Sequence, residues 1–262
     1  MENKRIFPEK REIEEEELSG FDPILLEKSM EISVPLSAEN IRSFSSYATV
    51  LREWNQKMNL TNITDDEGVA MRHFIDSLTL TEDIEREKRE KNAVDLSLLD
   101  VGTGAGLPGI PLKITMPSLQ ITLLDSLRKR VLFLEEVCRV LELRDIHVVH
   151  ARAEDAGNSR VYREQFDVVT ARAVAALPVL SEYCIPFVKI GGVFLAMKGQ
   201  NEDEAASSRK AIVQLGGTIE AIRNFTLPGT DMRRSIITIR KIRHTPPRYP
   251  RKAGSVRKDP LK

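Results

Sequence analysis

The residues with the clearest chemical meaning in this 262-residue sequence form a glycine-rich turn, LLDVGTGAGLPG at positions 98–109. An apolar run leads into Gly102, Gly104 and Gly106, and glycines let the backbone turn sharply and approach a ligand closely. Asp125 ends the next apolar run, where its carboxylate could accept both hydroxyls of a ribose. A strand, a glycine loop, a helix and an acid in this order indicate a nucleoside cofactor.

Two further residues bear on which nucleoside binds. The glycine spacing alone fits a dinucleotide, so an NAD-dependent oxidoreductase stays an alternative. Asp100 favours S-adenosylmethionine (SAM), because a carboxylate just before the glycines suits a cationic methionine end and would repel a pyrophosphate. Pro108 agrees, since proline at the helix start removes an N–H that a phosphate would use.

Polar side chains also follow two later strand patterns. Ala153 and Glu154 come after the third strand, at the edge expected to meet adenine, although a surface turn explains them as simply. Arg172 ends the fourth strand, at the carboxyl edge where ligands bind and where the transferred methyl group should point. No Pro-Cys pair follows that strand, which excludes the thiolate chemistry of C5-pyrimidine methyltransferases. The Asn/Asp-Pro-Pro-aromatic turn of exocyclic-amine methyltransferases is missing as well.

Basic residues lie where a polyanion could bind. Lys129 and Arg130 stand in the first turn of a helix, which costs about 0.3–1 kcal/mol each unless an anion lies nearby. Residues 240–262 hold nine basic side chains against one acid, a tail that fits a polyanionic partner or a solvated, frayed terminus. Arg72 and Asp76 have the spacing of a helix-surface ion pair.

The elements that position these residues change in character near residue 94. Before it, apolar residues recur every three or four positions at 36–59 and 71–78, predicting amphipathic helices, and the charged stretch 81–93 is interpreted as a helix end and linker. After it, strands and helices alternate, which predicts an α/β fold with a doubly wound, mostly parallel sheet. The predicted strands cover 96–102, 121–125, 146–154, 166–173, 191–199, 218–226 and 235–242.

Composition bears on disulfides, metal binding and the cellular location of the protein. The two cysteines sit in apolar runs, so a disulfide framework is not expected. Four scattered histidines give no metal-ligand spacing, and we expect no metal. No apolar run approaches a membrane span and the N-terminus lacks a signal-peptide core, so the predicted address is the cytosol.

Several further stretches resemble one known family in order along the chain. They read WNQKMNLTNIT (54–64), RHFIDSL (72–78), TLLDSLRKRVLFL (122–134), ARAE (151–154), TARAVA (170–175), MKG (197–199) and YPRKAGSVRKDPL (249–261). Together with the glycine loop they resemble the RsmG (GidB) family of bacterial small-subunit ribosomal RNA methyltransferases over roughly residues 20–262. The acidic N-terminus is the one departure from that family's pattern.

The resemblance implies a Rossmann-like, seven-stranded class I SAM methyltransferase that methylates N7 of a guanine in the decoding-region loop of 16S rRNA. By the family's pattern, SAM would contact Gly102, Leu107, Ala153, Glu154 and Arg172, with Asp125 on the ribose. Guanine N7 carries a lone pair and no proton, so direct in-line attack needs no base, metal or covalent intermediate. We expect Arg172 and Lys198 to hold the guanine or a flanking phosphate.

The remaining expectations concern RNA and domain organisation. Phosphate contacts are expected from Arg72, His73, Lys129, Arg130, Arg233, Arg234 and the tail. The partner would be rRNA or the small subunit, bound by a monomer. Expected regions are a disordered 1–20, a helical 21–93, a methyltransferase domain 94–243 and a basic tail 244–262. A small-molecule methyltransferase and a non-catalytic SAM-binding RNA chaperone stay open as alternatives.

Overall fold

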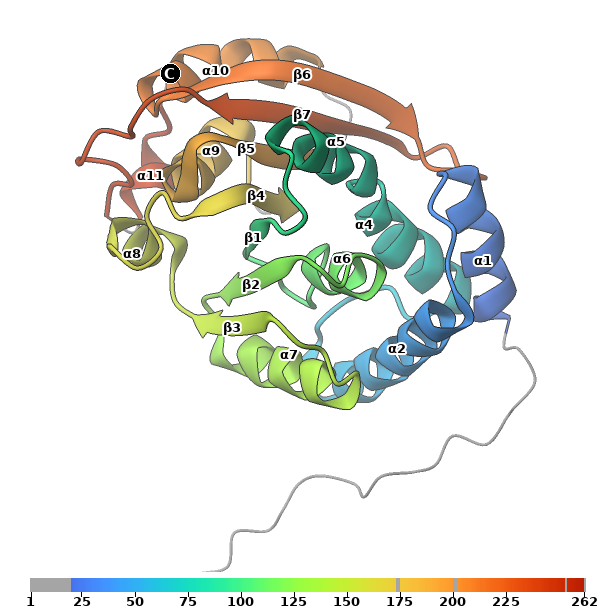
Figure 1. Cartoon of the computed structure of the whole chain (residues 1–262). Helices are drawn as coiled ribbons and strands as arrows, with labels where there is room; N and C mark the ends of the chain where they lie inside the picture. The colour runs from blue at the N-terminus through green and yellow to red at the C-terminus, as the bar shows by residue number, and fades with distance from the viewer. Residues whose placement is uncertain (1–19, 173–174, 200–201, 253, 262) are drawn as a thin grey trace, which may run out of the picture.

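A seven-stranded sheet lies at the centre of the computed structural model, which describes residues 20–172, 175–199, 202–252 and 254–261 (Figure 1). The strand order is β3-β2-β1-β4-β5-β7-β6, with β7 antiparallel to both neighbours and the other pairs parallel. The strands are β1 (Ser97–Val101), β2 (Gln120–Asp125), β3 (Ile146–His150), β4 (Phe166–Arg172), β5 (Val188–Gly199), β6 (Gly217–Thr226) and β7 (Arg233–Lys241). This arrangement confirms the predicted doubly wound, mostly parallel sheet.

Helices cover both faces of the sheet. Successive residues of a strand point to opposite faces, and in the central strands the residues on both faces are apolar and must be buried. Leu98 belongs to one hydrophobic core and Leu99 to the other. The first core lies under the N-terminal helices, α6 (Gly109–Thr115) and α7 (Arg128–Val140). The second lies under α8 (Ala153–Asn158), α9 (Leu177–Cys184), the 3-10 turn η2 (Ile185–Phe187), α10 (Glu202–Gln214) and the C-terminal segment with α11 (Ser255–Lys258). Central strands buried on both faces account for their continuous apolar runs.

The N-terminal helices pack against the glycine loop. They are α1 (Phe21–Glu31), α2 (Ala38–Met58), α3 (Asp66–Gly68), the π-helical turn η1 (Val69–Ile75), α4 (Asp76–Leu78) and α5 (Thr81–Lys91). Ser37 caps α2 through a reciprocal capping box with Asn40. Phe44 and Tyr47 of α2 pack on Phe74, with ring centroids 4.9 and 5.1 Å away, and the Tyr47 hydroxyl donates to the Ala105 carbonyl.

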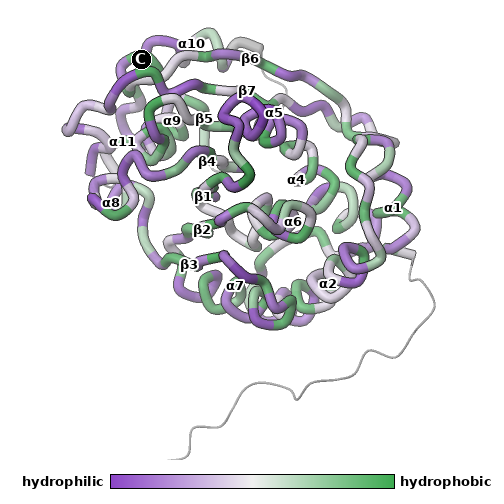
Figure 2. The backbone as a smooth tube through the Cα atoms, viewed as in Figure 1, coloured by the Kyte–Doolittle hydropathy of each residue, from purple (hydrophilic) through white to green (hydrophobic). Residues whose placement is uncertain are grey.

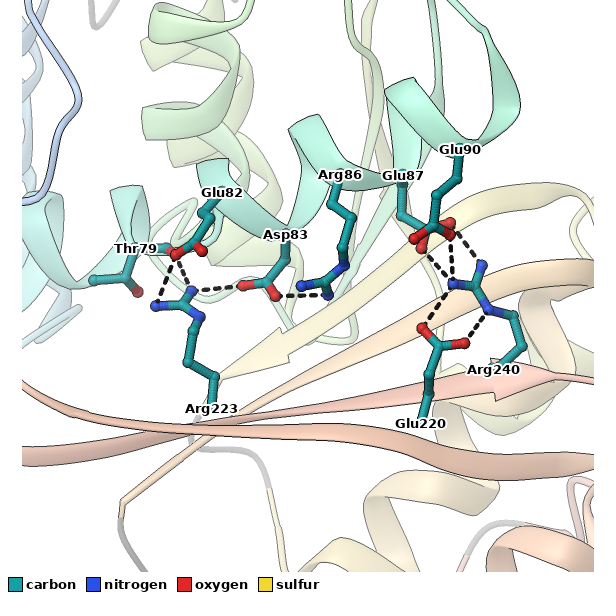
Figure 3. A network of polar contacts seen from close by, with 9 residues as sticks. All are labelled: Thr79, Glu82, Asp83, Arg86, Glu87, Glu90, Glu220, Arg223 and Arg240. Carbon is teal, nitrogen blue, oxygen red and sulfur yellow. Dashed lines mark hydrogen bonds and ion pairs between the residues drawn. The ribbon is translucent and has the colours of Figure 1, made fainter.

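Helix α5 corrects the prediction of a linker at 81–93. Figure 2 shows it largely in the hydrophilic colour, yet Asp83 and Glu87 are 1 % and 0 % exposed. Both carboxylates meet arginines of the β6–β7 hairpin: Arg223 donates to Asp83 at 2.6 Å, and Arg240 binds Glu87 at 2.7 Å (Figure 3). Arg240 also binds Glu90 and Glu220, so this tail cation is fully engaged.

The C-terminal segment is packed, which contradicts the frayed-terminus alternative. Tyr249 and Val256 are buried in the second core. Lys241, the second of the tail cations, is completely buried, and its Nζ lies 3.1 Å from Glu164 and 2.9 Å from the Ile185 carbonyl. Residues 1–19 and 262, on which parts of the N-terminal and tail predictions fall, lie outside the described residues. Within the described ranges no helix is long and apolar enough to cross a membrane.

Candidate functional site

The glycine loop joins β1 to α6 with its backbone in left-handed conformations. Gly104 has φ +63°, and a Cβ there would meet nothing closer than 3.9 Å, so its outer side is open. Gly106 differs: a Cβ would fall 2.4 Å from Ile110 and 2.8 Å from the Tyr47 hydroxyl. The loop therefore needs glycine for close packing of its inner side as much as for ligand approach on its outer side.

Asp100 anchors the loop from underneath. Its Oδ2 accepts from Thr103 Oγ1 at 2.6 Å and from the Gly109 N–H at 2.9 Å, while Oδ1 has no partner among the described residues. Complete burial raises the pKa of Asp100 to about 6, against the hydrogen bonds and the Arg172 charge that lower it. An unpaired, buried carboxylate oxygen beside the loop fits a cationic ligand group.

A cavity of about 350 Å³ opens beside this loop over the carboxyl ends of β1, β2 and β3, and we call it the cofactor cavity because residues predicted to bind the cofactor line it. It contains four of the residues expected at the cofactor: Gly102, Asp125, Ala153 and Glu154. Its whole lining is Val101, Gly102, Leu124, Asp125, Ser126, Ala151, Arg152, Ala153, Glu154, Tyr183, Gly254 and Arg257. The other expected cofactor residues, Asp100, Gly104, Gly106, Leu107 and Arg172, lie outside that lining.

Asp125 holds the junction between the loop and α7. Its carboxylate accepts from the Gly104 N–H at 3.0 Å and the Leu127 N–H at 2.8 Å. Arg130 approaches it at 3.4 Å, so this arginine faces the cofactor cavity's acid. Lys129 donates to the Met58 carbonyl at 3.1 Å. The two helix-start cations are therefore tied to neighbouring groups of the chain.

The basic cavity, about 330 Å³, lies over β4, β5 and β7 at the same edge of the sheet. Among its lining residues are five that the sequence nominated for catalysis or RNA binding: Arg72, His73, Arg172, Lys198 and Arg234. The rest of the lining is Asp76, Met197, Gly199, Phe225, Ser235 and Ile236. Arg233, also nominated, is exposed at the start of β7, next to this cavity.

Asp76 organises the basic cavity. Its carboxylate is 4 % exposed and accepts from Arg172 Nη1 at 3.1 Å and from Arg234 Nε at 2.9 Å. The same Arg172 nitrogen donates to the Arg72 carbonyl at 3.0 Å. The predicted Arg72–Asp76 surface pair is therefore wrong, because Asp76 points into the molecule and holds two arginines from distant strands.

His73 and Lys198 are both engaged by the protein. The His73 ring shares a 2.9 Å hydrogen bond with Thr61, and its Nδ1 has no partner among the described residues. Burial, helped by the Arg172 charge, lowers the pKa of His73 to about 4, so the ring is neutral at pH 7 and cannot contact phosphate as a cation. Lys198 donates to the Ala175 carbonyl at 2.8 Å and pairs with Glu204 at 3.0 Å.

Sequence reasoning did not place Tyr183 or Arg257 at the cofactor cavity or Phe225 at the basic cavity, and it did not predict the organising role of Asp76. A buried acid amid apolar residues was the available signal, since Asp76 lies between Ile75 and Leu78 and must find partners. Nothing in the sequence links residues 254–257 to a loop near residue 102. The ranges that the structure describes contain no cluster of side chains suited to a metal ion.

Comparisons with known proteins give one consistent result. The family model described as rRNA small subunit methyltransferase G (GidB) matches residues 40–234. A relative from Acetivibrio thermocellus named Ribosomal RNA small subunit methyltransferase G is 53 % identical over 238 residues, covering 91 % of this chain and 96 % of the relative. A relative of the same name from Staphylococcus carnosus is 48 % identical over 239 residues, covering 90 % and 97 %.

Solved structures align more distantly. A 16S rRNA (adenine(1408)-N(1))-methyltransferase from Catenulisporales acidiphilia aligns with a TM-score of 0.49 at 13 % identity, covering 62 % of this chain and 92 % of that chain. A precorrin-6y C5,15-methyltransferase from Geobacter metallireducens aligns with a TM-score of 0.43 at 19 % identity, covering 56 % and 80 %. On the family match over residues 40–234, which includes the glycine loop, and on the relatives at 53 % and 48 % identity, the chain belongs to the GidB family, rRNA small subunit methyltransferase G.

Proposed function

We propose that this protein transfers a methyl group from SAM to N7 of a guanine in small-subunit rRNA. The observation that carries the proposal is the pair of cavities at one edge of the sheet. One is lined by the glycine loop and carboxylates, and the other by arginines. Family membership supports the reaction, and the names of the relatives supply the class of substrate. Guanine N7 as the acceptor rests on the family alone.

The residues of the cofactor cavity fit SAM in character. Asp125 would accept the ribose hydroxyls, and the Ala153 N–H and Glu154 carboxylate would face the adenine. Asp100 is buried outside the cavity lining, but the negative charge of its carboxylate under the loop would attract the cationic end of SAM and repel a pyrophosphate. Bound SAM supplies an electrophilic methyl group on a sulfonium. These fits favour SAM over NAD as the nucleoside.

The basic cavity fits a guanosine and its phosphates. Guanine N7 already carries a lone pair, so the protein has no proton to remove and acts by orienting the base. All the hydrogen bonds that Arg172 makes among the described residues use Nη1, which leaves Nε and Nη2 for a ligand. Arginine commonly binds guanine through O6 and N7, and here O6 alone is available, since N7 reacts. Lys198 would support this group or a flanking phosphate from its place beside Glu204.

Fixing the arginines in advance lowers the cost of orienting the base. Asp76 holds both guanidinium groups before any ligand arrives, and alignment of reactants can supply up to about 7–11 kcal/mol of a barrier. The acceptor must be unstacked to reach such a cavity, as is usual for sequence-specific RNA recognition. Phe225 lines the same cavity and gives a base an aromatic surface on which to stack.

The direct test uses methyl-labelled SAM and small subunits from a strain that lacks this modification. We expect label at one guanine, released as 7-methylguanine after digestion. Naked rRNA run in parallel shows whether the assembled subunit is needed. Methyl transfer to a small molecule, with none to the subunits or the rRNA, would favour a small-molecule methyltransferase. Binding of NAD in place of SAM in equilibrium dialysis would overturn the proposal. Binding of SAM and RNA without transfer would identify the non-catalytic alternative.

A further inference from the structure

We propose that the C-terminal segment, residues 249–252 and 254–261, is a wall of the cofactor cavity and that Arg257 covers the adenine end of bound SAM. This inference rests on the proposed function, since it takes SAM as the ligand. It assigns the basic tail to the cofactor cavity, whereas the charges of the tail by themselves predict contacts with RNA phosphates. Gly254 and Arg257 line the cofactor cavity together with Ala153 and Glu154 from the end of β3.

The beginning of the segment is fixed to α8 and its neighbours. Arg163 donates to the Tyr249 carbonyl at 2.7 Å and to the Thr245 carbonyl at 2.7 Å. Asn158 donates to the Pro250 carbonyl at 3.1 Å. A Cβ on Gly157 would fall 3.0 Å from the Pro250 ring, so that ring lies directly on α8. The chain therefore leaves the sheet along a defined path.

A buried ion pair then closes the segment into a loop. Glu182 of α9 is completely buried and accepts from the Arg251 backbone N–H, Nε and Nη2 at 2.8, 2.9 and 2.7 Å. Arg251 Nη2 also donates to the Asp259 carbonyl at 2.8 Å, which joins the two ends of the loop. Between these ends the Val256 side chain is fully buried. Helix α11, which lies between these ends, packs beside α9 (Figure 1).

Arg257 is placed where a cation can meet an aromatic base. Arg257 lines the same cavity as Glu154 and Tyr183. Burial and the Glu154 charge raise the pKa of the Tyr183 hydroxyl, and the Arg257 charge lowers it. Arg257 is an exposed residue that lines the cavity. A planar guanidinium stacks well on aromatic rings, and Glu154 and Tyr183 line the cavity beside it.

The charge inventory of the tail favours this role over RNA binding. Three of the tail cations, Arg240, Lys241 and Arg251, pair with carboxylates of the fold. Arg257 lines the cofactor cavity, on the β3 side of the sheet, whereas the basic cavity lies over β4, β5 and β7. Because these cations are already paired within the fold, they favour a role of the segment in shaping the cofactor cavity over a role in binding RNA.

The test compares Arg257→Ala with Lys258→Ala, a neighbouring exposed cation outside the cavity lining. Calorimetry on the full chain should show SAM and adenosine both bound about tenfold more weakly by Arg257→Ala, which corresponds to about 1.4 kcal/mol. Lys258→Ala should bind both as the wild type does. Arg257→Lys, which keeps the charge but loses the planar group, should resemble Arg257→Ala.

Three outcomes would overturn the inference. Unchanged affinity of Arg257→Ala for SAM and adenosine, with weaker binding to small subunits, would assign Arg257 to RNA. Weaker SAM binding with unchanged adenosine binding would place it at the methionine end. Equal losses in Arg257→Ala and Lys258→Ala would indicate a general charge effect. Failure of the wild type to bind SAM would instead contradict the proposed function, and is seen before any variant is compared.

Discussion

Replacing Asp76 by asparagine should separate the arginines of the basic cavity from their shared anchor. The substitution conserves size but leaves one carbonyl oxygen where the carboxylate has two. Its NH₂ group would then face a guanidinium N–H, donor against donor. Arg172 at 3.1 Å and Arg234 at 2.9 Å cannot both keep their bonds.

The loss of stability in Asp76→Asn follows from the number of hydrogen bonds lost and from their ionic character. A hydrogen bond to a charged group contributes about 1.5–3 kcal/mol, and the surviving bond loses its ionic part. The Arg172 and Arg234 side chains are 14 % and 25 % exposed, so water can replace part of what is lost. We therefore expect the free energy of unfolding to fall by about 2–3 kcal/mol. Loosened arginines misplace the acceptor, and an error of about 1 Å can cost 10²-fold in rate.

The measurement combines urea unfolding with methyl transfer to unmodified small subunits. Asp66→Asn is the matched control, because its carboxylate is 47 % exposed, pairs with Arg52, and should contribute less than about 1 kcal/mol. Affinity for SAM should stay unchanged in both variants, since Asp76 lies outside the cofactor cavity lining. An Asp76→Asn protein with wild-type kcat/KM would refute the anchoring role, and an equal loss of stability in both variants would refute the burial argument.

Three further predictions follow from the same contacts. The pKa of Asp100 in the folded chain is about 6, above its ordinary 3.8, so its ionisation lowers the stability of the unliganded protein as pH rises from about 4 to 6. Asp100→Asn should therefore be more stable than the wild type at pH 7, as urea unfolding would show, yet bind SAM more weakly in calorimetry. Arg240→Ala should cost about 3–5 kcal/mol in urea unfolding, because it leaves buried Glu87 unpaired. A plot of log kcat/KM against log salt should fall with a slope of about −0.7 per phosphate contact, and Arg72→Ala should reduce that slope by one contact.

Each of these has a result that contradicts it. Equal stability of wild type and Asp100→Asn at pH 7 would mean that ionising this carboxylate is not costly. Arg139→Ala, which removes a 60 % exposed arginine from a surface pair, is the control for Arg240→Ala, and similar losses in both would rule out burial as the cause. A salt slope near zero would argue against RNA as the substrate.

The sequence predicts the sheet well because its central strands are short apolar runs and its outer strands still carry apolar and β-branched residues. All seven predicted strands are present, and their bounds differ from the observed ones by a few residues. Helix α5 escapes the same reasoning. Ile84 is its one buried apolar residue, and its inner face is built from Asp83 and Glu87, paired with Arg223 and Arg240. Hydrophobic periodicity cannot reveal a helix whose buried face is ionic.

The candidate site is predictable only where it depends on local sequence. The glycine loop and Asp125 are near each other along the chain, and both meet at the cofactor cavity. The charge of the tail alone predicts contacts with RNA, but Arg251 is bound to Glu182, 69 residues earlier, in a helix that is otherwise mostly apolar. An acid in an apolar helix needs a partner, yet the sequence does not say which of many cations supplies it.

The basic cavity depends on the direction of one strand. In a wholly parallel sheet, Arg234 at the start of β7 would lie at the edge opposite to Arg172 at the end of β4. Because β7 runs antiparallel to β5, Arg234 is paired with Gly199 at the carboxyl end of β5, and Ser235 is paired with Lys198. The reversal brings an arginine to the edge that already holds the cofactor cavity, within 2.9 Å of Asp76. Charge alone predicts that Arg234 binds RNA. The topology of the sheet brings it to the Asp76 carboxylate that also binds Arg172, so the two arginines act as a unit.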